Sequence, residues 1–207
     1  VSGSGKTSLV IECLVPALQA VIQGTKLPEH VDSIEAKGIQ SVKVIDSKPI
    51  GANVRSTVAT YDGVFDDLRK LFARTADAKA KGLTAGDFSY NTGKLRCPVC
   101  DGTGIITMDV QFLPDVDTIC PSCGGSRYGK DAYDILWKSK EKDSVSVSLP
   151  GLLKLTVEEA AGILHEETKI AKQLKILQDL GVCYLTLGEA TPALSGGEAQ
   201  RLKLAYE

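Results

Sequence analysis

The sequence predicts an α/β protein that contains a phosphate-binding loop, an inserted metal-binding module and a helical subdomain. Val1 to Thr7 reads V-S-G-S-G-K-T, which matches the second half of a P-loop. Leu194 to Gln200 reads L-S-G-G-E-A-Q, in which a serine and two glycines precede a predicted helix. Between these motifs, four cysteines form two CxxC pairs with the spacing of a four-thiolate zinc site: Cys97, Cys100, Cys120 and Cys123. Together the three motifs indicate a P-loop NTPase fold with a zinc insertion.

The composition excludes some classes of protein. The 207 residues are 43% hydrophobic and 24% charged, as in an ordinary folded protein. The formal net charge of −2 excludes a protein that coats nucleic acid through bulk positive charge, so any DNA contact is expected to be local. We find no run of about 18 apolar residues and no basic-then-apolar leader, which predicts no membrane partner and a cytoplasmic location.

The cysteine pattern favours metal binding over disulfides. Four of the six cysteines lie in CxxC pairs, and no secretory signal precedes them. Redox-active dithiols or free buried thiols are the alternatives to zinc. The other two, Cys13 and Cys183, are expected to be buried apolar residues. Because four thiolates complete the coordination of Zn²⁺, we expect a structural site, with tight turns at Gly102, Gly104, Gly124 and Gly125.

Three regions are expected along the chain. Residues 1–83 would form the N-terminal part of an ATP-binding domain, and residues 84–130 the inserted zinc-binding module. Residues 131–207 would form a helical subdomain that ends in the helix after Leu194. The first boundary rests on Thr84 to Lys94, whose Gly, Ser, Thr and Asn residues are typical of a loop.

In the first region we expect two helices and one strand. The first helix opens at Lys6, and Pro16 is expected to bend or end it; its apolar side comprises Leu9, Val10, Cys13 and Leu14. Ser41 to Asp46 alternates like a short strand. Helical spacing of apolar residues predicts an amphipathic helix over Asp62 to Phe72, with Asp66 and Asp67 on its solvated face.

The P-loop predicts a site for ATP and Mg²⁺. Its glycines let backbone N–H groups converge on phosphate oxygens at the start of a helix. Lys6 would contact the β- and γ-phosphates, and the Thr7 hydroxyl would bind Mg²⁺. The expected ATP-binding residues are Gly3, Ser4, Gly5, Lys6, Thr7 and Ser8; the alternative is a chance Gly/Ser turn before a helix. The first glycine of the motif and the Walker B carboxylates would lie outside these residues, so we expect weak nucleotide binding and no hydrolysis by this chain alone.

Basic and aromatic residues flank the cysteines. The expected DNA-binding residues are Lys94, Arg96, Arg127 and Lys130, with Phe112 and Tyr128 available for stacking. A basic hairpin with aromatic residues is a reasonable DNA contact surface. A solvated rim around a structural zinc ion is the alternative.

The third region is predicted to be mostly helical. Thr156-x-x-Glu159 matches a capping box, which predicts that a helix starts there. Helical spacing continues to Leu177, and Gly181 is a plausible C-terminal stop. Val182 to Leu187 then has the pattern of a short strand.

The motif at Leu194 resembles the signature sequence of ATP-binding cassette (ABC) proteins. Ser195, Gly196, Gly197 and Glu198 begin a predicted helix whose N–H groups and hydroxyl are suited to phosphate. In ABC proteins this element completes the ATP site of an opposing cassette. The continuation E-A-Q-R-L-K-L-A argues against a chance loop-to-helix junction.

The combination of motifs resembles the second nucleotide-binding half of the UvrA family of DNA-damage-recognition ATPases. Ordinary ABC transporters lack a zinc segment between P-loop and signature. The matching stretches cover most of the chain: V-S-G-S-G-K-T, P-I-G with R-S-T-V-A-T-Y-D-G-V-F-D-D-L-R-K-L-F-A, C-P-V-C-D-G-T-G, F-L-P-D-V, C-P-S-C-G-G-S-R-Y and L-S-G-G-E-A-Q-R-L-K-L-A.

The resemblance implies an ATP-binding zinc protein of nucleotide excision repair. Such a protein binds lesion-containing double-stranded DNA as a homodimer, uses ATP to find distorted duplex, and hands it to the UvrB subunit. By the same resemblance, Gly102 to Asp117 would form the hairpin that probes DNA.

One position departs from the family pattern D-Q-S-P-I-G. Ser47 stands where the family has the Gln that senses Mg²⁺ and the attacking water. This change raises the alternative of a UvrA-like paralogue in drug or antibiotic self-resistance. An ABC transporter ATPase is a further alternative. A zinc-dependent protein-binding module is the third alternative, since C-x-x-C-x-G-x-G also resembles the cysteine-rich region of DnaJ-type chaperones.

Overall fold

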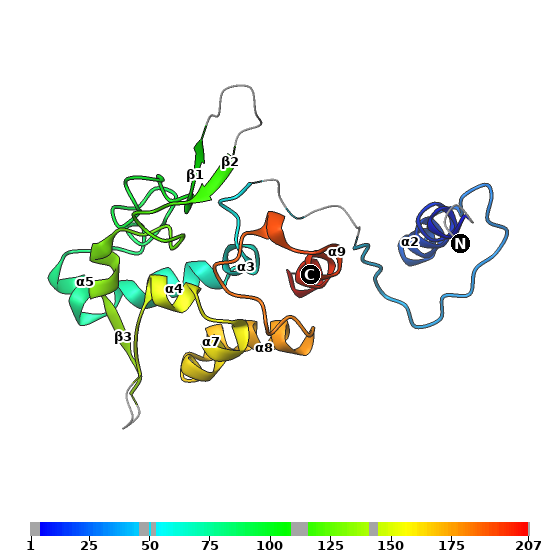
Figure 1. Cartoon of the computed structure of the whole chain (residues 1–207). Helices are drawn as coiled ribbons and strands as arrows, with labels where there is room; N and C mark the ends of the chain where they lie inside the picture. Colours follow the sequence, from blue (N-terminus) through cyan, green and yellow to red (C-terminus); the bar gives the residue numbers. More distant parts are fainter. Residues whose placement is uncertain (1–4, 46–49, 51–52, 109–115, 141–144, 207) are drawn as a thin grey trace. The chain divides into compact units, whose positions relative to one another are not determined.

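A computed structural model describes the chain except for residues 1–4, 46–49, 51–52, 109–115, 141–144 and 207. The chain divides into two compact units, Val1–Asp46 and Ser47–Glu207, which are described separately (Figure 1).

The first unit is built on one long helical segment. It consists of α1 (Lys6–Ser8), a π-helical turn at Leu9–Leu14 and α2 (Val15–Gln23). Of the two outcomes predicted at Pro16, a bend or an end of the helix, the structure excludes the end. Pro16 follows the π-helical turn, in which the Val15 N–H donates to Val10 O, so the helix has a wider turn where the proline ring enters. Gly24, in the left-handed region at φ 66°, follows the last residue of the helix.

Two further predictions for this unit are wrong. Residues 41–45 form no strand, because apolar alternation supplies no neighbouring strand to complete the hydrogen bonds, and Asp46 lies outside the described residues. Cys13 is half-buried, not buried. The predicted apolar side of the helix is exposed at Leu9, Val10 and Leu14.

The helical segment Lys6–Gln23 bears on the expectation that no part of the chain spans a membrane. Among the described residues, it is the helix that is long and apolar enough to cross a membrane, with a mean hydropathy of 1.2 over 18 residues. Length and composition alone are weak evidence for a span, because the core helix of a soluble protein passes the same test.

The second unit contains nine short helices and four strands among its described residues. Its helices are α3 (Val58–Tyr61), α4 (Val64–Ala73), α5 (Ala76–Ala80), η2 (Lys130–Asp134), α6 (Leu149–Leu153), α7 (Val157–Ile163), α8 (Thr168–Asp179), η3 (Thr191–Ala193) and α9 (Gly196–Tyr206). Its strands are β1 (Ile105–Met108), β2 (Val116–Ile119), β3 (Leu136–Lys138) and β4 (Ser146–Ser148).

Helix α4 is central to the hydrophobic core of this unit. Val64, Leu68 and Phe72 are fully buried on one face, which confirms the predicted amphipathic helix with its first residue at Val64. The helix packs against α3, α5, α6 and α8 (Figure 1). Its core extends into the loop before the cysteines, where the Phe88 ring lies 6.1 Å from the Phe72 ring.

The acidic face of α4 is only partly solvated. Asp66 is exposed, as predicted, and pairs with Arg69. The Asp67 side chain is only 12% exposed and lies 2.8 Å from Lys169 and 3.4 Å from Lys70. Burial opposes ionisation of Asp67, but the hydrogen bonds and charges of these two lysines hold its pKa below the ordinary value. Asp67 therefore joins α4 to α8.

Both sheets are small and antiparallel. β1 pairs with β2 in the register from Ile105–Ile119 to Met108–Val116, and β3 pairs with β4. The predicted α/β class holds in the coarse sense that helices and strands coexist. The central parallel sheet of a P-loop NTPase is not found within the described part of the chain.

The last region follows the helix predictions but not the strand prediction. Thr156 caps α7 in a reciprocal capping box with Glu159, as predicted. The predicted continuous helix is instead two helices, α7 and α8. Residues 182–187 form no strand beyond a single bridge from Thr186 to Thr156. They form an irregular segment in which Val182, Leu185 and Leu187 are buried. Cys183 is half-buried, contrary to prediction.

Candidate functional site

The four cysteines of the two CxxC pairs meet in one cluster. All four sulfur atoms lie within 4.8 Å of one another, with Cys97 Sγ 4.0 Å from Cys120 Sγ and Cys100 Sγ 3.7 Å from Cys123 Sγ. Four sulfurs bound tetrahedrally to Zn²⁺ at about 2.3 Å are about 3.8 Å apart. The cluster therefore has the dimensions of a four-thiolate zinc site.

The turns at the cysteines depend on glycine at two positions. Gly102 has φ 79°, and a Cβ there would lie 1.7 Å from the Tyr90 carbonyl oxygen. Gly104 has φ 81°, and a Cβ there would lie 2.8 Å from the Gly125 carbonyl oxygen. The Gly104 N–H donates to Cys100 Sγ at 3.3 Å. The close approach of Gly104 to Gly125 brings the two CxxC turns together.

The donor set fits zinc. Within the described residues, the metal-binding group contains only these four thiols, three of them buried. Burial works against the charged thiolates, yet hydrogen bonds from the Cys100 and Val99 N–H groups lower the pKa of Cys97 to about 7. Burial raises the pKa of Cys123 to about 12. A bound cation would compensate the charge that burial disfavours, so a metal ion suits this cluster better than four free thiols.

A closed ligand set implies a structural role for the metal. With all four positions taken by protein, no coordination site remains for substrate or water. Backbone hydrogen bonds tie the two turns together, because the Cys97 N–H donates to Arg127 O at 2.8 Å and the Cys120 N–H to Gly104 O at 3.0 Å. The zinc ion would fix these turns against each other.

Three of the four predicted DNA-binding residues lie on the surface. Lys94 and Arg96 line one hollow of about 410 Å³ beside the cysteine turns. Each is paired with a carboxylate, Lys94 with Asp87 at 3.5 Å and Arg96 with Asp101 at 3.0 Å. Lys130 is exposed at the start of η2.

Arg127 and Tyr128 are not available to DNA in this conformation. The Arg127 residue is 5% exposed, its Nη1 donates to Val54 O at 3.0 Å, and its guanidinium lies 5.2 Å from the Tyr90 ring centroid. Burial lowers the pKa of Arg127. Tyr128 is 1% exposed and donates its hydroxyl to Phe88 O at 2.6 Å. Their expected surface roles are therefore corrected: both side chains belong to the interior.

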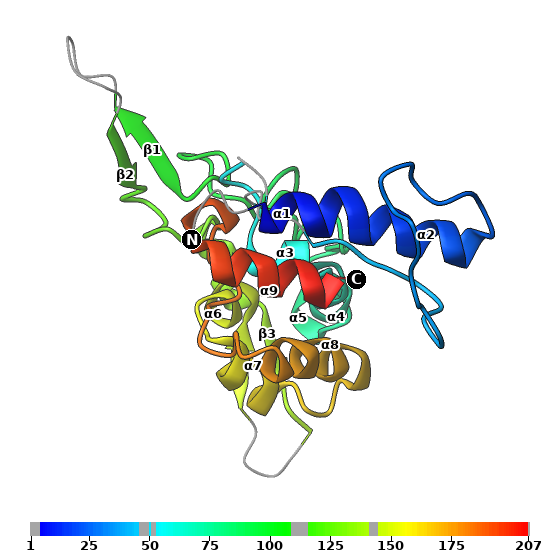
Figure 2. The ribbon, with the colours of Figure 1, turned by 90° about the vertical axis from the view of Figure 1, so that its right-hand side faces the viewer.

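The predicted DNA-probing hairpin projects from the helices of the second unit in both views (Figures 1 and 2). Its two strands are β1 and β2, and Ile119 is 70% exposed. The Thr107 hydroxyl donates to Asp117 at 2.7 Å across the ladder. Phe112 and the rest of residues 109–115 lie outside the described residues.

The described half of the P-loop begins a helix, as predicted. Gly5 precedes α1 at φ 77°, a conformation that favours glycine, and Lys6, Thr7 and Ser8 are exposed in the first turn. Gly3 and Ser4 lie outside the described residues, as does Ser47.

The signature residues cap α9. The Ser195 N–H donates to Glu198 Oε2 at 2.7 Å, and the Glu198 N–H donates to Ser195 Oγ at 3.4 Å. The Tyr184 hydroxyl also donates to Glu198, at 2.7 Å. The Ser195 and Tyr184 hydrogen bonds hold the pKa of Glu198 below its ordinary value. Gly196 and Gly197 remain exposed at the helix start.

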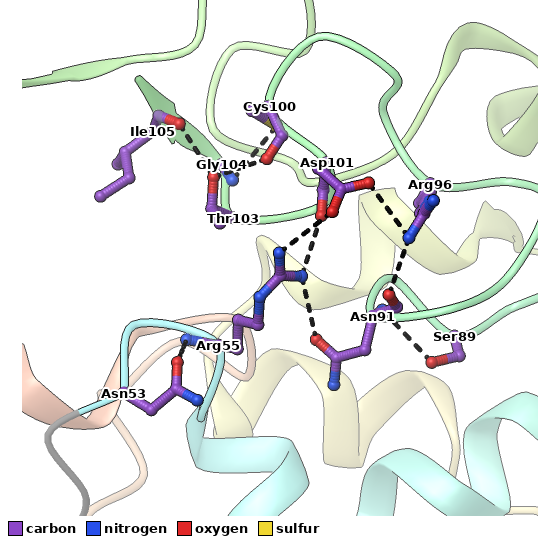
Figure 3. Close-up of polar contacts among 10 residues, drawn as sticks. All are labelled: Asn53, Arg55, Ser89, Asn91, Arg96, Cys100, Asp101, Thr103, Gly104 and Ile105. Atoms are coloured by element: carbon purple, nitrogen blue, oxygen red, sulfur yellow. Dashed lines mark hydrogen bonds and ion pairs between the residues drawn. The ribbon is translucent and has the colours of Figure 1, made fainter. Parts of the chain in front are cut away.

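A polar network beside the cysteines was missed from the sequence (Figure 3). Arg55 donates to Asp101 O at 2.8 Å and lies 3.3 Å from Asp101 Oδ2. Arg96 contacts the other carboxylate oxygen at 3.0 Å and donates to Asn91 O at 3.0 Å. Asp101 has φ 50°, which is uncommon for a residue other than glycine. The sequence gives no signal that pairs Arg55 with Asp101, because 45 residues separate them.

Comparisons with known proteins agree on one kind of relative. The whole chain is 45% identical over 211 residues to UvrABC system protein A of Staphylococcus epidermidis, and 44% identical over 209 residues to UvrABC system protein A of Staphylococcus aureus. The crystal structure of UvrA2 from Deinococcus radiodurans matches all of this chain with a TM-score of 0.79 and 40% identity. No protein-family model matches the chain.

The chain is much shorter than these relatives. It spans 21% of the length of each UvrABC system protein A and 24% of the UvrA2 chain. The similarity confirms the resemblance to the UvrA family and supports a P-loop fold that carries a zinc module.

Proposed function

We infer that this chain, which matches UvrABC system protein A over its whole length, corresponds to the part of a UvrA-type protein that carries the second ATP-binding cassette. The four-cysteine cluster carries this inference, because in the sequence it lies between a P-loop and an ABC signature. Its sulfur atoms also have the spacing of a zinc site. The function proposed is ATP-dependent recognition of DNA damage in nucleotide excision repair.

ATP and Mg²⁺ would bind at the start of α1. Lys6 would place its ammonium group against the β- and γ-phosphates, and the Thr7 hydroxyl would hold Mg²⁺. Exposure of both residues in the first helical turn supports this role. Ser195, Gly196 and Gly197 at the start of α9 would complete the ATP site of an opposing cassette, which implies a dimeric or two-cassette protein.

DNA would be contacted from the surface of the zinc module. Lys94, Arg96 and Lys130 would bind phosphates, and the β1–β2 hairpin would reach distorted duplex. A lesion makes duplex easier to deform, so a probe that acts by deformation separates damaged from intact DNA without reading bases. UvrB would be the partner that receives the DNA, and the cytoplasm the place of action.

The proposed function is tested on the full-length protein that contains this chain. We expect ATP-dependent binding that prefers a duplex with one bulky lesion over the same duplex without it, measured by competition at fixed salt. The matched control is Lys94→Gln with Lys130→Gln, which should weaken binding to both duplexes. Equal affinity of the wild-type protein for the two duplexes would exclude damage recognition.

Ser47 supports a second candidate, a UvrA-like paralogue that acts in resistance to a DNA-binding drug or antibiotic. Serine is too short to reach the water that the family's glutamine senses, so hydrolysis could be uncoupled from DNA. The variant Ser47→Gln separates the candidates. A gain of DNA-stimulated hydrolysis in the variant would favour the paralogue, and full coupling in the wild-type protein would favour the repair enzyme.

A further inference from the structure

A short segment before α3 is held by side chains from the zinc module. Arg127 Nη1 donates to Val54 O at 3.0 Å, and the Tyr90 hydroxyl donates to Arg55 O at 3.0 Å. The Arg55 side chain in turn extends from the segment to the zinc module, where it binds both the carbonyl and the carboxylate of Asp101 (Figure 3). Two consecutive carbonyls and one side chain of this segment are therefore fixed by the module.

The residues that hold the segment are themselves placed by the cysteine turns. Asp101 directly follows Cys100 and adopts a left-handed backbone conformation, with φ 50°. Arg127 follows the second turn with φ 71°, and its own carbonyl accepts the Cys97 N–H at 2.8 Å. Both conformations are uncommon outside glycine and persist only where the surrounding structure enforces them.

The contact of Arg127 with Val54 and the contact of Arg55 with Asp101 differ in strength. Arg127 is 5% exposed, and a buried guanidinium needs hydrogen-bond acceptors, of which Val54 O is one. Arg55 is partly exposed, so its pair with Asp101 is a weaker contact. Arg96 also binds Asp101, but its other contact is Asn91 O within the module, so it does not touch the segment before α3.

We propose that Arg55, Asp101 and Arg127 form a latch through which metal binding at the four cysteines fixes the conformation of residues 54–56. Without the metal, the two cysteine turns lose their common centre, and Asp101 and Arg127 lose the positions from which they hold the segment. The coupling is reciprocal: a segment that is released weakens metal binding by the same factor.

Amide hydrogen exchange of this chain, with zinc bound and after removal by a chelator, tests the latch. The reporters are the Arg55 N–H and Ser56 N–H, both bonded to Asn53, and the Thr57 N–H, which donates to Thr60 Oγ1. Zinc removal should raise exchange of these amides together with that of residues 97–104. Faster exchange at 97–104 alone would overturn the proposal.

Two substitutions sharpen the test with zinc bound. Arg55→Ala should speed exchange of the reporters on the order of fivefold, the effect of one lost hydrogen-bonded pair, and raise the zinc dissociation constant by a similar factor. Arg96→Gln also loses a contact with Asp101 but should leave the reporters unchanged. Equal effects of the two substitutions, or no effect of Arg55→Ala, would overturn the latch. Arg55→Lys, which keeps the charge, replaces Arg55→Ala if that variant does not fold.

An expected effect of nucleotide binding on residues 54–56 rests on the proposed function. Residues 54–56 follow Ser47 along the chain, and Ser47 stands where the UvrA family has the Gln that senses Mg²⁺ and the attacking water. In the full-length protein that contains this chain, a non-hydrolysable ATP analogue with Mg²⁺ should therefore change exchange of the same reporters. If zinc alters them and the analogue does not, the latch stands and the proposed nucleotide role fails.

Discussion

Some charged residues of this chain are buried, and the sequence alone does not show which ones. Arg127 lies in a basic stretch beside the cysteines, which suggested a DNA contact, yet its backbone turns the side chain inward against Tyr90 and Val54. Asp101 shows the same limit, because its partner Arg55 is remote in sequence. The spacing of the two CxxC pairs, in contrast, predicts that the four cysteines cluster, and their sulfur atoms do lie within 4.8 Å of one another.

Asp62 is half-buried with one shielded carboxylate oxygen, and the charge of this carboxylate costs stability. Burial raises its pKa to about 7, and Asp62 Oδ2 has no hydrogen-bond partner among the described residues. The folded chain keeps this proton up to about pH 7, while the unfolded chain releases it near the ordinary value of 3.8. The contribution of Asp62 to stability therefore falls as pH rises between these values.

We expect Asp62→Asn to stabilise the chain at about pH 8, by on the order of 1 kcal/mol after allowance for solvent screening. The gain should be smaller at about pH 5.5, where most of the folded wild-type chain is already protonated at Asp62. Urea unfolding at both pH values measures the difference. Asp131→Asn, at an exposed carboxylate, serves as the control and should show no pH-dependent gain. An equal effect of Asp62→Asn at both pH values would contradict this account.

Gly102 is the tightest backbone approach beside the metal ligands. Gly102→Ala would place a Cβ 1.7 Å from Tyr90 O in a residue with φ 79°, so we expect a loss of more than about 2 kcal/mol and weaker zinc binding. Gly162→Ala is the matched control. That glycine lies in α7 with nothing within 4 Å of a Cβ, so the change should gain about 0.5–1 kcal/mol. Thermal unfolding of both variants measures the two effects. A change of the same sign in both variants would contradict this account.

At the scale of elements, helices could be predicted better than strands. The spacing of Val64, Leu68 and Phe72 and the capping box at Thr156 are local signals, and a helix satisfies its own backbone. A strand needs a neighbour that the local sequence cannot supply. Residues 182–187 have the apolar pattern of a strand, but their hydrogen bonds go to the turn and helix start at 153–158, as in Leu187 N–H to Leu155 O at 3.0 Å.

The start of α7 depends on a reciprocal cap. The Thr156 hydroxyl accepts the Glu159 N–H at 3.2 Å, and Glu159 accepts the Thr156 N–H at 2.8 Å. Thr156→Ala should cost about 1 kcal/mol in chemical unfolding. Thr168→Ala, at the first residue of α8, removes no cap hydrogen bond and should be close to neutral. Similar losses for both substitutions would show that the cap does not stabilise the helix.

The same cap has a pH dependence with a definite sign. Hydrogen bonds from Thr156 hold the pKa of Glu159 below its ordinary value of 4.5. The interaction is present above that value and is lost as the pH falls through the lower value of the folded chain. The difference between wild type and Thr156→Ala should therefore shrink in acid.

At the scale of the whole molecule, the chain combines a P-loop motif, a cluster of four cysteines and a helix at the signature motif in one sequence. The order of these motifs could be predicted from sequence, and whole-chain similarity to UvrABC system protein A agrees with it. The division into two compact units could not, because it depends on packing between distant residues. The four-cysteine cluster, as the proposed metal centre, separates this chain from ordinary transporter ATPases, and the proposed latch depends on it.

Zinc content per chain, measured by elemental analysis after purification under reducing conditions, tests that centre most directly. We expect one zinc ion in the wild-type chain, none in Cys120→Ser, and one in Cys183→Ser, since Cys183 lies outside the cluster. Loss of zinc in Cys120→Ser should also unfold the two cysteine turns. A wild-type chain without zinc, or full zinc retention in Cys120→Ser, would contradict the account.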